Sequence, residues 1–197
     1  ATLLNLSCLP VPVPVVKKCE TRLIFDAGRM KTKALNPDET LISDVSILVF
    51  DADGYAEECR WIPDAGEATT IQLIKGNRYS IRACANFGYK VYADHIDELK
   101  EVSFYMAYPD EYREGMPMFA SIDDFTAGED DSIELHFQRL MAKISLQMDR
   151  SRLSEDISMT VLSACIGNCP KSVNICGPSK VSSGDQCFAK GFSRGEF

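Results

Sequence analysis

The chain has few basic residues relative to acidic ones, few histidines, and no long apolar run. Its 197 residues include 21 Lys and Arg against 29 Asp and Glu, which gives a net charge of -8. A nucleic-acid-binding protein needs a basic surface that displaces counterions from phosphates, so this charge disfavours that class and no nucleic-acid partner is expected. No apolar run reaches the roughly 18 to 20 residues that a membrane-spanning helix needs.

The sequence also lacks the motifs of the common enzyme classes. It contains no G-x-S-x-G elbow, no H-E-x-x-H helix, no phosphate-binding P-loop and no G-x-G-x-x-G fingerprint. His136 lies in "IELHFQR", where alternation with Leu135 and Phe137 predicts an outward-facing strand residue. His95 lies in a short helical segment and is expected to be a solvated surface group. We therefore predict that the protein is not an enzyme and has no cofactor or metal.

Acidic residues are plentiful in "AYPDEYREG" and "SIDDFTAGEDDS". A catalytic pair of carboxylates depends on the distance between two acids in three dimensions, so the sequence neither finds nor excludes one. A carboxylate-dependent hydrolase therefore stays open as a rival hypothesis. The interpretation that we prefer for both runs is that of solvated loops.

Eight cysteines are many for a cytosolic chain of this size. Four of them lie in "CIGNCPKSVNICGPSKVSSGDQC", with gaps of three, six and ten residues. Structural zinc sites usually have close C-x-x-C pairs, so buried thiols or disulfides are favoured over zinc. The disulfide connectivity cannot be read from the sequence. The eight positions are Cys8, Cys19, Cys59, Cys84, Cys165, Cys169, Cys176 and Cys187.

The first 18 residues read as a signal-peptide tail, a lipid cysteine and a spacer. "ATLLNLSC" is similar to the end of a secretory signal that stops at a small residue and a cysteine. Leu6 and Ser7 suit a lipoprotein signal before Cys8, whereas Asn5 stands where an aliphatic residue is expected. Lipidation of Cys8 and an incidental cysteine are both open. "LPVPVPVVKK" predicts a stiff extended spacer, because proline fixes φ and lacks a donor.

From Cys19 onward the pattern predicts β-strands. Val45, Ile47 and Val49 would share one face of a half-buried strand, and Tyr79, Ile81 and Ala83 would alternate in another. One short helix is expected in "ADHIDELKEVSFYM". The fold class is therefore all-β, an antiparallel β-sandwich with one short helix. The expected strand segments are "TRLIFDAG", "ISDVSILVFD", "YAEECRWI", "TTIQLI", "NRYSIRACANFG", "DSIELHFQRLMAKISLQM" and "DISMTVLSACIG".

Asp51, Asp53 and Gly54 allow two interpretations. They are similar to the start of a calcium loop, and they also fit a hairpin turn between two strands. Counted from Asp51, a calcium loop would need an oxygen ligand at Tyr55 and a glycine at Ala56. The sequence therefore predicts a hairpin.

Several segments, in this order, resemble the fimbrillin-A-associated anchor proteins of Bacteroidales-type fimbriae. They are "CETRLIFDAG", "ISDVSILVFDADGYA", "LIKGNRYSIRACANFG", "GMPMF", "LHFQRLMAKISLQM" and "CIGNCPKSVNICG". The resemblance runs from about Cys19 to the end, and "KGNRYSIRACAN" and "RLMAKI" are its most telling parts. Members of this family are lipoproteins with two transthyretin-like β-sandwich domains that hold a fimbria to the outer membrane and limit its length.

The resemblance implies an exported protein anchored in the outer membrane through a lipid on Cys8, with fimbrial stalk or accessory subunits as partners. Contact with those subunits would use strand addition at a sheet edge. "RLMAKI" would be a central strand, with Arg139 and Lys143 at its polar edges. The core side chains of that strand would be Met141, Ile144 and Leu146.

The expected organisation has three parts. Residues 1–18 carry the signal tail, Cys8 and the spacer, and residues 19–170 form the β-sandwich. Residues 171–197 are C-terminal strands or the start of a second, truncated domain, because family members are about twice the length of one such domain.

An extracellular glycan-binding β-sandwich is the alternative function. Sugars stack on exposed aromatic rings, and the loops supply several tyrosines, which are equally compatible with half-buried packing. These candidates are Tyr89, Tyr92, Tyr105, Tyr108 and Tyr112.

Overall fold

The computed structural model describes residues 16–28, 41–105, 115–141, 149, 151–154, 156–157, 163–169, 172–176 and 186–191. Within these ranges the elements are β-strands and one 3-10 turn, so the predicted all-β class is confirmed. No helical element there has the length and apolar character needed to cross a bilayer. The elements are β1 (Lys18–Asp26), β2 (Val45–Phe50), β3 (Ala56–Ile62), β4 (Ala68–Ile74), β5 (Arg78–Ala85), η2 (Ile96–Lys100), β6 (Ser103–Tyr105), β7 (Met118–Thr126), β8 (Ser132–His136), β9 (Gln138–Arg139), β10 (Ser163–Cys169), β11 (Ser172–Asn174) and β12 (Gln186–Gly191).

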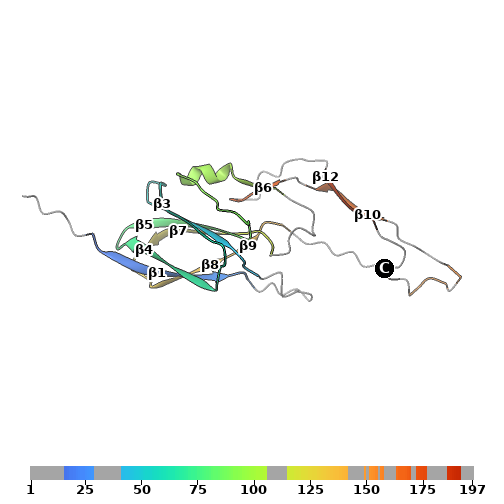
Figure 1. Cartoon of the computed structure of the whole chain (residues 1–197), viewed down its shortest axis with the longest axis horizontal. Helices are drawn as coiled ribbons and strands as arrows, with labels where there is room; N and C mark the ends of the chain where they lie inside the picture. Colours follow the sequence, from blue (N-terminus) through green and yellow to red (C-terminus); the bar gives the residue numbers. More distant parts are fainter. Residues whose placement is uncertain are drawn as a thin grey trace, which may run out of the picture.

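Two sheets pack face to face to form the sandwich (Figure 1). One has the strand order β4-β1-β8, and the other has the order β3-β2-β5-β7-β9. The described strand pairs are antiparallel, as predicted, apart from β1 and β8, which are parallel. Their register runs from Arg22 opposite Ser132 to Asp26 opposite His136. A parallel pair needs a long crossover, and here the rest of the sandwich separates the two strands in sequence.

The five-stranded sheet has a hydrophobic cluster on each face. The first cluster lies between the two sheets and includes Leu23, Ile47, Ile71, Ile81, Met118 and Leu135. The second lies on the opposite face and includes Leu48, Phe50, Cys84, Phe87, Leu99, Phe104 and Ile175. The residues that cover this second face come from the segment after β5 and from the end of β11. The molecule therefore has three layers, with the five-stranded sheet in the middle.

Strand β2 is buried on both faces. Val45, Ile47 and Val49 share the face toward the first cluster, as their alternation predicted. Leu48 and Phe50 belong to the second cluster and have no exposed surface. The prediction of a half-buried strand was therefore wrong. Full burial of each such side chain contributes about 1.5–3 kcal/mol, so this strand is a main source of stability.

The predicted helix is shorter than its pattern suggested. Only Ile96–Lys100 forms a helical turn, and Ser103–Tyr105 is strand β6, which pairs with β11. The partner of β6 lies about seventy residues later in the chain, with Val173 opposite Phe104. Local spacing could not predict this pairing, because the strand depends on a non-local partner.

The turn between β2 and β3 is a hairpin, as predicted, and the flanking strands exclude a helix–loop–helix calcium site. The Asp51 carboxylate accepts hydrogen bonds from the backbone N–H groups of Asp53 and Tyr55, at 3.0 and 2.8 Å. Gly54 takes a φ of +90° at the tip. Its carbonyl accepts a hydrogen bond from the Ile96 N–H at 2.9 Å, so the hairpin docks on the start of η2.

His95 was predicted to be a solvated surface group, and this was wrong. It is the N-cap residue of η2, and its Nδ1 accepts the Asp97 N–H at 3.2 Å. Its Nε2 lies 3.2 Å from the Asp53 carbonyl, and its ring packs edge-on against Tyr55. The side chain therefore joins η2 to the hairpin.

The described part of "RLMAKI", residues 139–141, does not form a central strand. Gln138–Arg139 is the two-residue strand β9 at the end of the five-stranded order, and Met141 packs against the second cluster. Lys143, Ile144 and Leu146 lie outside the described residues. Strands β10 and β12 pair as a separate antiparallel ribbon, far from the start of β1 along the long axis (Figure 1). The predicted domain boundaries stay a prediction.

Replacing Gly54 with alanine tests the docking of the hairpin on η2. A Cβ there would lie 2.8 Å from His95 Nε2 and would sit at a positive φ, so we expect a marked loss of stability. Gly76→Ala is the matched control, because Gly76 has a φ of +86° but open space around its Cβ. The control should lose roughly 1–2 kcal/mol for the backbone alone, and Gly54→Ala should lose more. Equal losses in urea unfolding would contradict the contact.

Candidate functional site

On one side of the sandwich, where β3 and β4 form the edges of the two sheets, an arginine side chain occupies an edge carbonyl. The Arg22 N–H donates to the Asp131 carbonyl, so the backbone groups of Arg22 face β8 and not β4. Thr70, which lies opposite Arg22 on β4, therefore points its own N–H and C=O groups away from β1. The Thr70 carbonyl accepts a hydrogen bond from Arg60 Nη1 at 2.8 Å, and Arg60 also pairs with Glu58 at 2.5 Å. A charged side chain that occupies an edge acceptor is a known protection against strand pairing.

The opposite side, formed by β7 and β8, is different. Within the described residues, β9 pairs only with Met118 and Phe119 of β7, and β8 pairs only with β1. We call the segments 120–126 and 132–136 the β7–β8 edge. Along it, the described part of the chain provides no second ladder partner.

The backbone groups of β8 that face outward can be assigned from its parity. The Asp131 carbonyl and the Phe137 N–H are both bonded to β1, to Arg22 and Asp26 respectively. Alternate residues of a strand point their N–H and C=O groups to opposite sides. Ser132, Glu134 and His136 therefore direct their backbone groups toward the open side.

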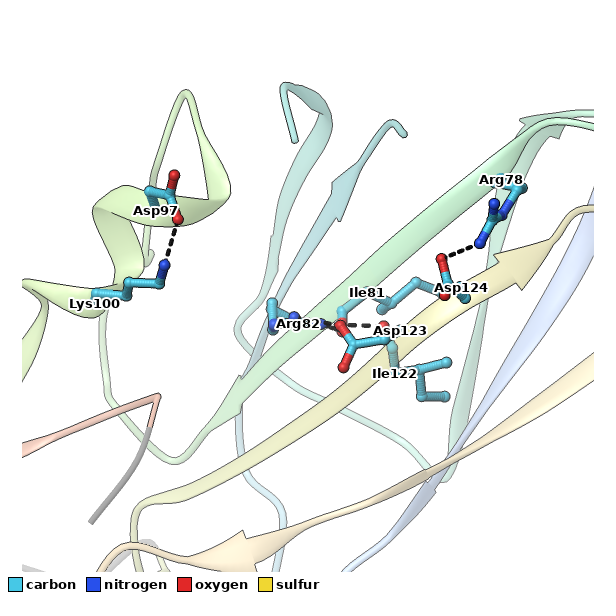
Figure 2. A network of polar contacts seen from close by, with 8 residues as sticks. All are labelled: Arg78, Ile81, Arg82, Asp97, Lys100, Ile122, Asp123 and Asp124. Atoms are coloured by element: carbon cyan, nitrogen blue, oxygen red, sulfur yellow. Dashed lines mark hydrogen bonds and ion pairs between the residues drawn. The ribbon is translucent and has the colours of Figure 1, made fainter. Parts of the chain in front are cut away.

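Strand β7 bends at a β-bulge next to this edge. The register between β5 and β7 shifts between Tyr79 and Ile81, and Asp124 takes a φ of 56°. Two ion pairs of 2.5 Å flank the bulge, Arg82 with Asp123 and Arg78 with Asp124 (Figure 2). "SIDDFT" is therefore strand, and the prediction of a solvated loop for it was wrong. The acidic run gave no sign of the bulge, because a bulge is defined by the pairing with a ladder partner, and here that partner is remote in sequence.

Arg82 holds the bulge more firmly than Arg78. Its side chain is only 13% exposed, and it also donates to the carbonyls of Ile81 and Ile122, at 3.0 and 3.1 Å. Arg78 and Asp124 have side chains that are 60% and 76% exposed. Arg82 reaches the Ile122 carbonyl from the β5 side, because Ile122 lies opposite Ile81 in the ladder, so this bond stabilises the bulge.

Changing the two arginines separates these roles. We expect Arg82→Met to lower the free energy of unfolding by about 1–3 kcal/mol, because the half-buried Ile122 carbonyl loses its charged donor. Arg78→Met should cost less than about 1 kcal/mol, since exposed ion pairs contribute little. Urea unfolding of both variants measures the difference, and a larger loss for Arg78→Met would refute the assignment.

Three apolar side chains border the β7–β8 edge. Ile122 and Phe125 of β7 and Ile133 of β8 pack against the first cluster but stay only partly buried. Around them lie exposed acidic residues that form an acidic rim, in which Asp123 and Asp124 are paired with Arg82 and Arg78. The rim residues are Asp123, Asp124, Glu129, Asp130, Asp131 and Glu134.

The remaining sequence candidates do not gather into one site. His136 is exposed on β8, as predicted, at 68% of its side chain, and it lies 2.9 Å from the Asp26 carboxylate. Tyr89, Tyr92 and Tyr105 are exposed, but their rings make no contact with one another within the described residues. Tyr108, Tyr112 and Cys8 lie outside the described residues.

Cys84 and Cys176 are packing groups of the second cluster rather than nucleophiles. Cys19, Cys59, Cys84 and Cys176 are free thiols, whereas Cys165 is disulfide-bonded and is thus lost to the alternative of a zinc site. Burial raises the pKa of the Cys84 thiol far above its usual range, with Cys176 and Asp44 adding to the effect. Burial also raises the pKa of Cys176. Both thiols therefore stay protonated, and a protonated thiol is a poor nucleophile.

No protein-family model matches the sequence, and no curated protein matches it. The structure is similar to a fimbrial assembly protein from Parabacteroides distasonis, with a TM-score of 0.57, 15% identity, and coverage of 92% of this chain and 79% of that one. It is also similar to a fimbrilin from Porphyromonas gingivalis, with a TM-score of 0.59, 14% identity, and coverage of 83% and 53%.

A candidate cell adhesion protein from Bacteroides eggerthii has a TM-score of 0.57, 13% identity, and coverage of 84% of this chain and 54% of that one. The chain thus spans about half the length of the fimbrilin and of this third structure. At these identities the likeness is one of fold. The resemblance to Bacteroidales fimbrial proteins is confirmed at that level.

Proposed function

We propose that the chain is a structural component of a fimbria, an anchor or minor subunit, that binds a neighbouring subunit by strand addition on β8. The observation that carries the proposal is the asymmetry of the sandwich. On the β3–β4 side Arg60 occupies the outward Thr70 carbonyl, whereas β8 presents outward backbone groups beside the partly exposed Ile122, Phe125 and Ile133. The fold shared with fimbrial proteins supports the biological setting.

The incoming strand would pair with β8 rather than with β7. Ser132, Glu134 and His136 offer regularly spaced N–H and C=O groups, while the bulge shifts the register of β7 against β5 and makes its course less regular. The strand's backbone would gain hydrogen bonds, and its alternate apolar side chains would cover the three apolar residues. The acidic rim favours a partner strand that carries lysine or arginine.

The same proposal assigns the chain no catalytic role. Among the described residues, the two thiols with raised pKa are protonated, and His95 is engaged as a helix cap. The sequence lacks the motifs of the common enzyme classes. The exposed tyrosines are scattered, so no observation favours the glycan-binding alternative.

The membrane side of the proposal rests on Cys8 and the spacer behind it. A lipid on Cys8 would hold the protein at the outer membrane of an exporting bacterium, with the proline–valine segment as a stiff connection. Strand β1 begins at one end of the long axis and the β10–β12 ribbon lies toward the other (Figure 1). That arrangement suits a tethered scaffold.

A proline on β8 tests the docking strand. Ser132→Pro removes one outward N–H at the start of β8 without touching a bond to β1, so binding to the purified fimbrial stalk subunit should weaken about tenfold. Thr70→Pro is the matched control, since it removes an outward N–H on the β3–β4 side. Surface plasmon resonance with the full-length protein measures both. Equal weakening, or no binding by the unchanged protein, would refute strand addition on β8.

Cys8→Ser in the precursor from the complete gene tests the lipid anchor. We expect the variant to leave the membrane fraction, because two or more acyl chains are needed for stable attachment. Mass spectrometry of the mature N-terminus should show an acylated cysteine in the unchanged protein. Cys19→Ser, at the next cysteine, should stay in the membrane. A membrane-bound Cys8→Ser protein would refute the anchor.

A further inference from the structure

Three side chains that ligate metals meet on the outer face of the three-stranded sheet. Asp26 and His136 lie directly opposite each other in the parallel register of β1 and β8. Glu134 lies two residues before His136 and therefore on the same face of β8. One ligand atom from each of the three lies within 4.8 Å of the others.

Asp26 fixes the ring of His136. Its Oδ2 lies 2.9 Å from His136 Nδ1, and its Oδ1 accepts the Gly28 N–H at 2.9 Å. The Asp26 carbonyl accepts the Phe137 N–H at 2.8 Å, which holds the two backbones in place. When the neutral ring donates its Nδ1 proton to this carboxylate, its lone pair lies on Nε2.

Nε2 of His136 is turned toward Glu134, whose Oε2 lies 3.9 Å away. Both side chains are more than half exposed, so an ion can reach the gap between them. The other histidine has no such freedom. The ring nitrogens of His95 lie 3.2 Å from the Asp97 N–H and from the Asp53 carbonyl.

We propose that His136 Nε2 and Glu134 bind a divalent first-row transition metal ion, with Asp26 as the positioning residue behind the imidazole. An imidazole and a carboxylate suit Zn²⁺, Ni²⁺ and Cu²⁺, whereas Ca²⁺ and Mg²⁺ prefer a full set of oxygen ligands. The Asp26–His136 hydrogen bond matches the carboxylate–histidine–metal arrangement that orients ligands in known sites. The remaining coordination positions are left to water.

The parallel pairing of β1 and β8 creates this site. In parallel register, the last residue of β1 lies beside the last residue of β8 on the same outer face. The charge of the cluster also favours a cation, because two carboxylates face a single imidazole. Arg22 lies on the same face but four residues before Asp26, opposite Ser132. The site stands independently of the fimbrial role, since it needs no partner protein.

Zinc titration of the full chain, followed by NMR of the histidine ring nitrogens, tests the proposal. The chain has only two histidines, so the ring signals of His136 and His95 can be assigned separately. Zinc that binds to free thiols does not contact these rings and is therefore distinguished from zinc at His136. We expect Zn²⁺ to move the His136 Nε2 signal and to leave His95 unchanged.

Variants assign the roles. Glu134→Gln should abolish the saturable shift, and Asp26→Asn should weaken binding about 10- to 100-fold while His136 remains the ligand. Glu20→Gln, an exposed carboxylate on β1, is the control and should bind as the unchanged protein does. The proposal is overturned by an immobile His136 signal under a large excess of zinc. A shift that neither Glu134→Gln nor Asp26→Asn reduces would overturn it as well.

Discussion

The fold depends on the burial of the five-stranded sheet on both of its faces. Strand β2 lies inside that sheet, and its six residues are all buried. An antiparallel sheet can expose one face to water, but this one carries Leu48, Phe50 and Cys84 on the face away from the sandwich core. That face must be covered, and the segment after β5, together with β11, provides the cover. Hence the short η2 turn and β6 occupy the place where the local pattern suggested a longer helix.

Because both faces of the five-stranded sheet are covered, unpaired backbone N–H and C=O groups of the sandwich can lie only at the strand edges. The molecule treats its two sides differently. Arg60 reaches from β3 to a carbonyl of β4 on one side, whereas on the other side β8 directs its alternate backbone groups outward. The bulge in β7, held by Arg82, bends the neighbouring strand away from regular pairing. Among the described strands, β8 has β1 as its one ladder partner.

The parallel pair of β1 and β8 has consequences beyond topology. It sets which residues of β8 face outward, and it brings Asp26 beside His136. Neither the proposed docking strand nor the proposed metal site would have this geometry in a hairpin arrangement of the same two strands. Both follow from one register between segments that lie more than a hundred residues apart.

The sequence alone determined the all-β class, the hairpin at Asp53 and Gly54, and the shared faces of Val45, Ile47 and Val49 and of Tyr79, Ile81 and Ala83. These features depend on local alternation and on turn residues, which act in the same way whichever distant segments pack alongside. Only the tertiary structure decided that β2 is buried twice, that His95 is a cap, that "SIDDFT" is a strand with a bulge, and that Asp26 meets His136. Each of these depends on which distant segment lies alongside, and no local period encodes the identity of a neighbour.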